Sequence, residues 1–363
     1  MTRHFQPFSE RKKQNQMSTK VAVISFTERG SIVGKKLSSV LAEKGYLCTC
    51  FAPEKLAVNF GFESINGEYI KWAENIFNRY DVLLFISAVG IAVRGIAPYI
   101  KDKFTDPAVI VIDEKENFVV PLLSGHVGGA VEFAKVICEI TNAVPVITTA
   151  TDINNKFAFD VFAVKNDLKI VQRTEAKEIS SALLSGENIS FCCDWEYFGK
   201  IPKGVQNSNK GNIGVVVSVF NKKLYNINLN LVPKKVHLGI GCKKDTPKEN
   251  IEKAVNSFLK ENNIFEEAVK SFATITIKQN EKGIIEFCNE KGWPVKYFTA
   301  EDLNTAKGSF NSSEFVKKIT GTDNVCERAA VLSSGNGKLI AGKTAFNGVT
   351  LAAACEKWSV DFG

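Results

Sequence analysis

Histidine is scarce in this chain, and the cysteines are not spaced as metal ligands. The 363 residues include three histidines, His4, His126 and His237, and nine cysteines that form no C-x-x-C pair. Structural zinc sites use four Cys or His ligands at short spacings, so no metal site is predicted. The N-terminus also lacks the apolar stretch of a secretory signal, so free thiols in a reducing cytoplasm are expected.

Long apolar runs and basic blocks interleaved with aromatic residues are absent too. Runs such as Ala108–Ile112 and Ile213–Phe220 fall far short of the roughly 20 residues that a membrane span needs. Neither a membrane nor a nucleic acid is therefore an expected partner. The net charge of +7 fits either a small polyanionic substrate or a solubilising surface.

Three common catalytic signatures are also missing. No G-x-S-x-G occurs, which disfavours a serine-hydrolase triad. The glycine-rich turn described next matches neither G-x-G-x-x-G nor the P-loop pattern, so neither a dinucleotide nor ATP is inferred.

The segment Phe118–Glu132, FVVPLLSGHVGGAVE, is the most informative part of what is present. Its first six residues, to Leu123, predict a buried strand, and Ala130–Thr141 predicts a helix. Between them lies Ser124–Gly129, called here the SGHVGG loop. A glycine turn before a helix N-terminus presents backbone N–H groups and the positive end of the helix dipole, which suits an anionic ligand.

Two polar residues of the SGHVGG loop are candidates for chemistry. His126 can transfer protons near neutral pH or contact a ligand, or it bonds a neighbouring carbonyl and shapes the loop. Ser124 binds an anion or an oxyanion, or it caps the helix. The glycines Gly125, Gly128 and Gly129 permit positive φ and close backbone approach.

Alternating short strands and helices predict an α/β protein with several parts. Residues 1–19 are predicted to be a disordered tail, with either Met1 or Met17 as the start. Residues 20–159 predict a mostly parallel, doubly wound sheet with helices on both faces. Residues 160–232 predict a small α+β segment, and residues 233–357 a separate, compact α/β domain.

In a parallel sheet, ligands bind beyond the carboxyl ends of the strands. The turn that contains Gly90 and the SGHVGG loop both follow strands, so both are expected at that edge. Arg94, on a short helix after Gly90, can hold a carboxylate, with a surface ion pair as the alternative. Asp106 and Asp113 are predicted to be turn residues.

The C-terminal part carries two predicted capping boxes, Thr246–Glu249 and Thr299–Asp302. Before the first box, a glycine turn with Gly241, Lys243 and Lys244 either receives an acidic group or carries solvated lysines. Cys242, within that turn, is a poor nucleophile candidate, because only His237 lies near it in sequence.

Glu327 is the remaining candidate for catalysis. It begins an alanine-rich helix, where a carboxylate either complements the helix dipole or faces a cleft.

Several long stretches together carry a family resemblance. The run SAVGIAVRGIAPYIKDKFTDPAVIVIDEKENFVVPLLSGHVGGAVEFAKVI, followed by AVPVITTATD, closely resembles the N-terminal signature of the CbiG family of cobalamin biosynthesis. HLGIGCKKDTP, ATITIKQNEKGIIEFC, NVCERAAVL and GKTAFNGVTLAAA resemble its C-terminal domain, which also occurs as the separate protein CobE. The resemblance spans Lys20–Cys355 and is least distinctive over Asp160–Val232. Where the family often has LGGANELA, Val131 replaces the asparagine.

The resemblance implies a cobalt-precorrin-5A hydrolase. In that reaction water opens a δ-lactone, and C20 leaves with its methyl group as acetaldehyde to give cobalt-precorrin-5B. Cobalt is carried by the substrate, so no protein cofactor is expected. The expected partner is an anionic cobalt tetrapyrrole, with neighbouring pathway methyltransferases as further partners.

The resemblance gives the reaction, and the residue roles are our hypothesis. His126 would activate water or move protons, the amides of 125–129 would hold the oxyanion, and Arg94 and lysines would hold substrate carboxylates. The competing hypothesis is a tetrapyrrole carrier or chaperone that binds the intermediate without turning it over.

Overall fold

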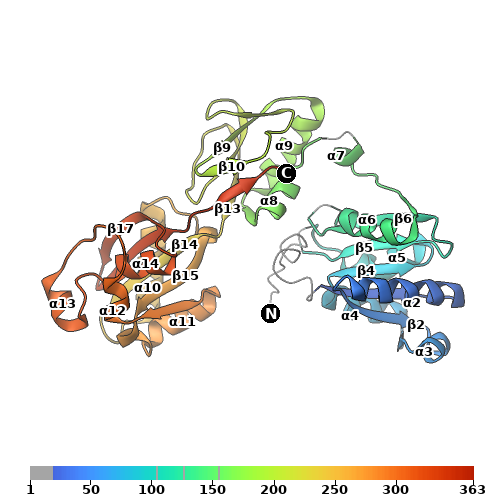
Figure 1. Cartoon of the computed structure of the whole chain (residues 1–363), viewed down its shortest axis with the longest axis horizontal. Coiled ribbons are helices and arrows are strands. Elements are labelled where there is room, and N and C mark those ends of the chain that lie inside the picture. The colour runs from blue at the N-terminus through green and yellow to red at the C-terminus, as the bar shows by residue number, and fades with distance from the viewer. Residues whose placement is uncertain (1–18, 104, 126, 154–155) are drawn as a thin grey trace. The chain divides into compact units, whose positions relative to one another are not determined.

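The computed structural model describes residues 19–103, 105–125, 127–153 and 156–363. It divides into two compact units, residues 1–165 and 166–363 (Figure 1). Of the predicted tail at residues 1–19, only Thr19 is among the described residues.

The N-terminal unit is built on a seven-stranded sheet in the order β3-β2-β1-β4-β5-β6-β7. Its strands are β1 (Lys20–Ser25), β2 (Leu47–Ala52), β3 (Glu63–Ser64), β4 (Val82–Ile86), β5 (Ala108–Ile112), β6 (Phe118–Leu123) and β7 (Val144–Pro145). Its helices are α2 (Glu28–Glu43), α3 (Glu54–Phe60), α4 (Tyr69–Arg79), α5 (Val89–Ile96), the 3-10 turn η2 (Ala97–Tyr99), α6 (Ala130–Thr141), α7 (Ala150–Ile153) and α8 (Phe159–Lys165).

The alternation of side chains along the central strands explains the two helical layers. Val21 and Val23 of β1 pack in one core with α2 and α6. Ala22 and Ile24 pack in a second core with α4 and α5. Because successive side chains point to opposite faces, strands that are apolar throughout need helices on both faces. The predicted doubly wound α/β fold is confirmed.

Strand β6 runs antiparallel to β5, because only residues 113–117 join the two strands. Val109 pairs with Leu123 and Ile112 with Val119, so the carboxyl end of β6 lies where β5 begins. A parallel connection would need a crossover of a dozen or more residues. The expectation that the SGHVGG loop and the Gly90 turn share one edge is therefore wrong, because they follow strands that end at opposite edges.

The two aspartates that bracket β5 have the turn roles predicted for them. Asp113 accepts hydrogen bonds from the amides of Lys115, Asn117 and Phe118. Asp106, which is 3% exposed, accepts bonds from the amides of Lys101 and Asp102.

The second unit contains a middle segment, residues 166–233, and a C-terminal segment, residues 234–363. The middle segment holds β8 (Leu168–Ile170), α9 (Arg173–Ser185), β9 (Ile189–Cys193), β10 (Glu196–Phe198), β11 (Val205–Asn207), β12 (Ile213–Val217) and β13 (Ile227–Pro233). The C-terminal segment holds β14 (Val236–Cys242), α10 (Lys248–Glu261), η3 (Glu266–Ala268), β15 (Val269–Ile275), η4 (Thr276–Lys278), α11 (Lys282–Lys291), β16 (Val295–Phe298), α12 (Ala300–Asn304), α13 (Glu314–Thr320), α14 (Cys326–Ser333), β17 (Lys338–Phe346), β18 (Val349–Cys355) and β19 (Ser359–Asp361).

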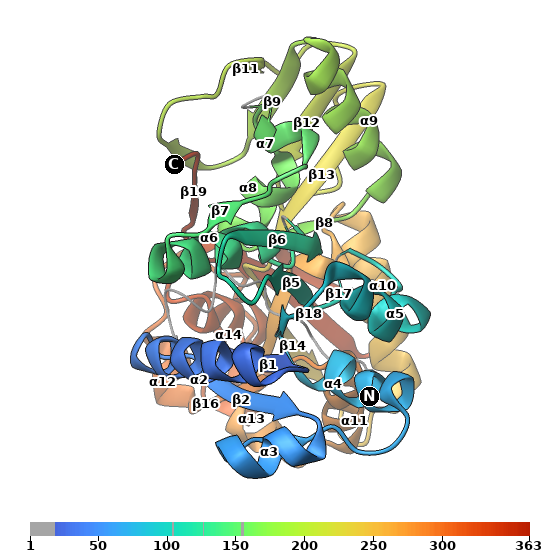
Figure 2. The ribbon, with the colours of Figure 1, turned by 90° about the vertical axis from the view of Figure 1, so that its right-hand side faces the viewer.

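The middle sheet has the order β11-β9-β12-β13-β8, with β8 antiparallel to β13 and the other pairs parallel. Helix α9 lies along β13 (Figure 2). Val219 and Val232, at the carboxyl ends of β12 and β13, pack in the core of the C-terminal segment. Part of the edge at which such sheets usually bind ligands is therefore covered.

Strand β19 returns to the middle segment and pairs in parallel with β10 (Figure 1). Asn166 and Asp361 exchange two hydrogen bonds, of 3.0 and 2.7 Å. The ring of Phe362 lies 5.0 Å from that of Phe191, measured between centroids. These contacts hold the two segments together as one unit.

The C-terminal sheet has the order β16-β15-β14-β18-β17, and β14, β15 and β16 are parallel. Val236, Leu238 and Ile240 pack in the core with α10 and α11. On the opposite face, a Cβ on Gly239 would lie 1.8 Å from the carbonyl oxygen of Cys326. Glycine is therefore required where α14 crosses β14.

Of the two predicted capping boxes, one is confirmed. The Thr299 side chain accepts from the amide of Asp302, and Asp302 accepts from the amide of Thr299. The box at Thr246 is wrong, because α10 begins at Lys248 with Pro247 as its N-cap. The Thr246 hydroxyl instead donates to the carbonyl of Lys243, in the preceding turn.

Candidate functional site

Ser124 joins the end of β6 to the turn before β5. Its side chain is buried, and its hydroxyl donates a 3.1 Å hydrogen bond to the carbonyl of Asp106. Its φ of 56° lies in the left-handed region. The N-cap of α6 is Gly129, not Ser124. The structure therefore places the Ser124 hydroxyl in a contact that shapes the loop.

Two amides at the start of α6 have acceptors inside the SGHVGG loop. The amide of Ala130 donates to the Ser124 carbonyl at 3.1 Å, and the amide of Val131 donates to the Gly125 carbonyl at 3.0 Å. An oxyanion would therefore have to bind amides that precede Ala130. His126, the candidate base, lies outside the described residues.

Gly129 has a φ of 83°, in the left-handed region that favours glycine, and Gly128 has no room for a side chain. A Cβ there would lie 2.3 Å from the Ser124 Cβ and 2.8 Å from its carbonyl oxygen. At Gly125 the nearest atoms would be 3.5 Å away, which is ordinary contact. The φ angles of Gly125 and Gly128 are not positive.

We expect Gly128→Ala to lower the free energy of unfolding by about 1–3 kcal/mol, because the new methyl group forces Ser124 and residue 128 apart. Gly125→Ala is the matched control and is expected to cost less than about 0.5 kcal/mol. Thermal denaturation followed by circular dichroism compares the two. Equal melting temperatures for both variants would show that the loop relaxes freely.

Gly90 and Arg94 lie at the other edge of the N-terminal sheet, beyond the carboxyl end of β4. A Cβ on Gly90 would lie 3.7 Å from Nη1 of Arg94, so the exposed guanidinium lies over the first turn of α5. β1 ends at this edge too, and Thr27, the N-cap of α2, donates to Glu114 at 2.5 Å. Strand order reverses between β1 and β4, the position at which such sheets usually bind ligands.

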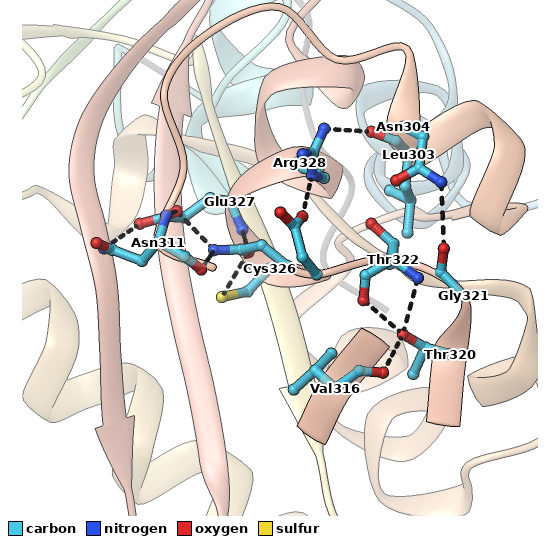
Figure 3. A network of polar contacts seen from close by, with 12 residues as sticks. Leu303, Asn304, Asn311, Val316, Thr320, Gly321, Thr322, Cys326, Glu327 and Arg328 are labelled. Atoms are coloured by element: carbon cyan, nitrogen blue, oxygen red, sulfur yellow. Dashed lines mark hydrogen bonds and ion pairs between the residues drawn. The ribbon is translucent and has the colours of Figure 1, made fainter. Parts of the chain in front are cut away.

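Glu327 lies in the first turn of α14 and is 1% exposed. Hydrogen-bond donors surround its carboxylate (Figure 3). It accepts four hydrogen bonds: from the amide and side chain of Asn311 at 2.8 and 2.9 Å, from the side chain of Asn324 at 2.6 Å, and from the amide of Lys343 at 2.7 Å. These donors come from the loop after α12, the turn before α14, and β17. The carboxylate therefore ties three segments to one helix end.

Gly241 and Lys243 lie at the carboxyl end of β14, on the same side of the domain as the start of α14. A Cβ on Gly241 would lie 2.7 Å from the Thr350 hydroxyl, which donates to the Gly241 carbonyl. Lys243 is exposed, and its amide donates to the Gly348 carbonyl. The candidates thus fall in three places: two opposite edges of the N-terminal sheet, and one edge of the C-terminal sheet.

The Cys242 thiol is unsuited to nucleophilic attack. Burial raises its pKa, although the nearby Lys278 ammonium acts in the opposite direction. A thiol with a raised pKa has little thiolate at neutral pH. The prediction that Cys242 is a poor nucleophile is consistent with this geometry.

Sequence reasoning missed a buried polar cluster around His237, whose side chain is 0% exposed. Its Nδ1 lies 2.7 Å from the Ser271 hydroxyl and 2.8 Å from the Ser333 hydroxyl, and its Nε2 lies 2.9 Å from Glu356. Glu356 also accepts from Lys270 at 2.6 Å. The partners lie 34 to 119 positions away along the chain, so no local pattern points to them.

His237 is expected to make the protein less stable in weak acid. Burial lowers its pKa below 6.5, outweighing the contact with Glu356. Below pH 6.5 the unfolded chain therefore binds a proton that the folded protein does not, and stability falls by at most about 1.4 kcal/mol per pH unit. Urea unfolding at pH 7.5 and 5.5 should show a larger loss for the wild type than for His237→Gln. Parallel losses in the two proteins would contradict this prediction.

Among the described residues, no group of three or more His, Cys, Asp or Glu side chains could hold a metal ion. In the same part of the chain, no helix is long and apolar enough to cross a membrane.

Comparison with known proteins decides the family. Three family models match: "Cobalamin synthesis G N-terminal" over residues 71–152, "Cobalamin biosynthesis central region" over 157–233, and "Cobalamin synthesis G C-terminus" over 236–354. The chain belongs to the CbiG family. The resemblance noted from its sequence is therefore confirmed.

Two curated CbiG relatives align over most of both chains. The cobalt-precorrin-5A hydrolase of Salmonella typhimurium is 34% identical, covering 91% of this chain and 96% of its own. That of Priestia megaterium is 28% identical, covering 92% and 94%.

Two solved structures also match. A cobalamin biosynthesis protein G homologue from Sulfolobus solfataricus is 25% identical with a TM-score of 0.38, covering 94% of this chain and 98% of its own. CobE is 22% identical with a TM-score of 0.32, covering 34% of this chain and 91% of its own.

The CbiG family models place all the candidate residues inside matched regions. The N-terminal model, from residue 71 to 152, includes Gly90, Arg94 and the SGHVGG loop. The C-terminal model, from residue 236 to 354, includes Gly241, Lys243 and Glu327.

Proposed function

We propose that this chain is a cobalt-precorrin-5A hydrolase that opens the δ-lactone of its substrate and releases C20 with its methyl group as acetaldehyde. The observation that carries the proposal is the alignment with two enzymes of that name over more than nine tenths of this chain.

Within this proposal, the SGHVGG loop supplies the hydrolytic chemistry. His126 takes a proton from water or returns one to the departing oxygen. The amides of residues 127–129 stabilise the oxyanion, since those of Ala130 and Val131 donate within the loop. Ser124 positions this loop by its bond to Asp106 and does not act as a nucleophile.

The remaining candidate residues are proposed to bind the substrate or to stabilise the fold around it. Lys243, which is exposed, is proposed to hold a peripheral carboxylate of the tetrapyrrole. Arg94 follows β4, which ends at the edge opposite the SGHVGG loop, so it is not assigned to a substrate whose lactone lies at that loop. Glu327 is proposed to hold the loop after α12 in place, because its oxygens already accept four hydrogen bonds.

The proposal is tested by anaerobic incubation of the protein with cobalt-precorrin-5A, alcohol dehydrogenase and NADH. Hydrolysis with loss of acetaldehyde consumes NADH in proportion to substrate. Tight binding of the tetrapyrrole without NADH consumption would instead support the carrier hypothesis and reject the hydrolase.

A further inference from the structure

The large exposed apolar side chains of the C-terminal segment lie in stretches that follow two neighbouring strands. Residues 234–363 are all described, and their large exposed apolar residues are Ile277, Phe315 and Ile319, at 64%, 73% and 62% exposure. Ile277 lies in η4, directly after β15, and the other two lie in α13, reached from β16 through α12. Because β14, β15 and β16 are parallel, these stretches start from one edge of the sheet.

Helix α13 presents its apolar pair from a fixed position. Phe315 and Ile319 are four residues apart, so they share one face of the helix. Val316 packs against a core that includes Leu303 and Val325. The hydroxyl of Ser313, the N-cap of α13, accepts a hydrogen bond from the amide of Val316.

Two further bonds fix the ends of the helix. The amide of Ser313 donates to the Asp323 carbonyl at 3.0 Å. The side chain of Asn304 donates to the Gly321 carbonyl at 3.2 Å, as Figure 3 shows. Covering this fixed apolar pair with an apolar ligand would remove its surface from water, which is favourable.

Lysines accompany this apolar pair. Lys318 is exposed on α13 beside Ile319, whereas Lys317 is exposed on the side of the helix opposite the apolar pair. Lys243 and Lys244 are exposed in the turn after β14. The edge therefore offers apolar surface together with positive charge. A flat apolar ring with anionic groups around its rim complements both features.

The size of the pair also favours a small ligand over a protein. Two side chains of this kind bury on the order of 300 Å² together, whereas a stable protein interface buries about 800 Å² on each partner.

We propose that α13 is a contact for the substrate macrocycle, with Phe315 and Ile319 against its flat face and Lys318 paired with one of its peripheral carboxylates. This inference rests on the proposed function, which supplies an anionic tetrapyrrole as the ligand. It assigns recognition of the ring to the C-terminal segment, away from the SGHVGG loop in sequence.

The test is a titration of the full chain with cobyrinic acid, a stable cobalt corrinoid with free carboxylates, followed by tryptophan fluorescence. The double variant Phe315→Ser, Ile319→Ser is expected to raise Kd about tenfold or more. Val58→Ser is the matched control, because Val58 is 77% exposed on α3, and its Kd is expected to stay within about twofold. Lys318→Gln should raise Kd at low salt and flatten its salt dependence.

The outcomes separate this proposal from the function. If the double serine variant binds the corrinoid as the wild type does, the role of α13 is rejected, and acetaldehyde release by the wild type leaves the function standing. If the wild type neither binds corrinoid nor releases acetaldehyde, both proposals fail. If the wild type forms dimers that the serine variant does not, with equal corrinoid affinity, the pair is a protein interface and the role of α13 is again rejected.

Discussion

Replacing Glu327 by alanine is expected to lower the free energy of unfolding by about 3 kcal/mol or more. The substitution strands four buried or partly buried donors that now bond its carboxylate, and each stranded group costs about 1–3 kcal/mol unless water reaches it. Differential scanning calorimetry of the full chain measures the loss.

Two further variants show whether the loss of stability comes from the hydrogen bonds of Glu327. Glu327→Gln keeps the size of the side chain but loses acceptors, so we expect a smaller but clear loss of stability. Glu286→Ala is the control, because Glu286 is exposed on α11, and its melting temperature should be unchanged. A Glu327→Gln protein with wild-type stability and no acetaldehyde release would instead support a catalytic carboxylate.

Replacing His126 by alanine is expected to lower kcat about 10²- to 10⁴-fold, the usual contribution of a general acid or base. KM should change little, because carboxylate contacts elsewhere bind the substrate. Acetaldehyde release, measured through NADH consumption under anaerobic conditions, gives both constants. The pH dependence of kcat should lose the limb that reflects an imidazole with a pKa near neutrality.

A second substitution distinguishes chemistry from loop shape at this position. His126→Gln retains a side chain that can bond a neighbouring carbonyl, so it would restore activity if the ring only shapes the loop. We expect it to be as impaired as His126→Ala, with added imidazole raising the rate of the alanine variant. An unchanged rate in His126→Ala would remove the histidine from the mechanism.

The fold class could be predicted from the sequence because the signals are local. Strands that are apolar throughout, such as β1, β4 and β5, alternate with helices of ordinary length, and this is enough to predict a doubly wound sheet. The direction of β6 was predictable as well, since the link of residues 113–117 is too short for a crossover. Because β6 is antiparallel to β5, the SGHVGG loop lies at the edge opposite the Gly90 turn.

Features that depend on distant partners were not predictable. The capping motif at Thr299 forms, whereas that at Thr246 does not, because the Thr246 hydroxyl bonds the Lys243 carbonyl and its amide donates to Glu281. Glu327 could be recognised as a helix-start carboxylate, but its four donors include Lys343, brought close by β17. Burial of this kind is decided by tertiary packing.

The pairing of β10 with β19 has a consequence for synthesis of the protein on the ribosome. β10 ends at Phe198, and its partner strand β19 begins at Ser359. The middle segment therefore lacks the strand that pairs with β10 until residues 359–361 have been translated. The N-terminal sheet draws all its strands from residues 20–145 and can form much earlier. Phe191 and Tyr197, which contact Phe362, are therefore expected to stay exposed to chaperones during elongation.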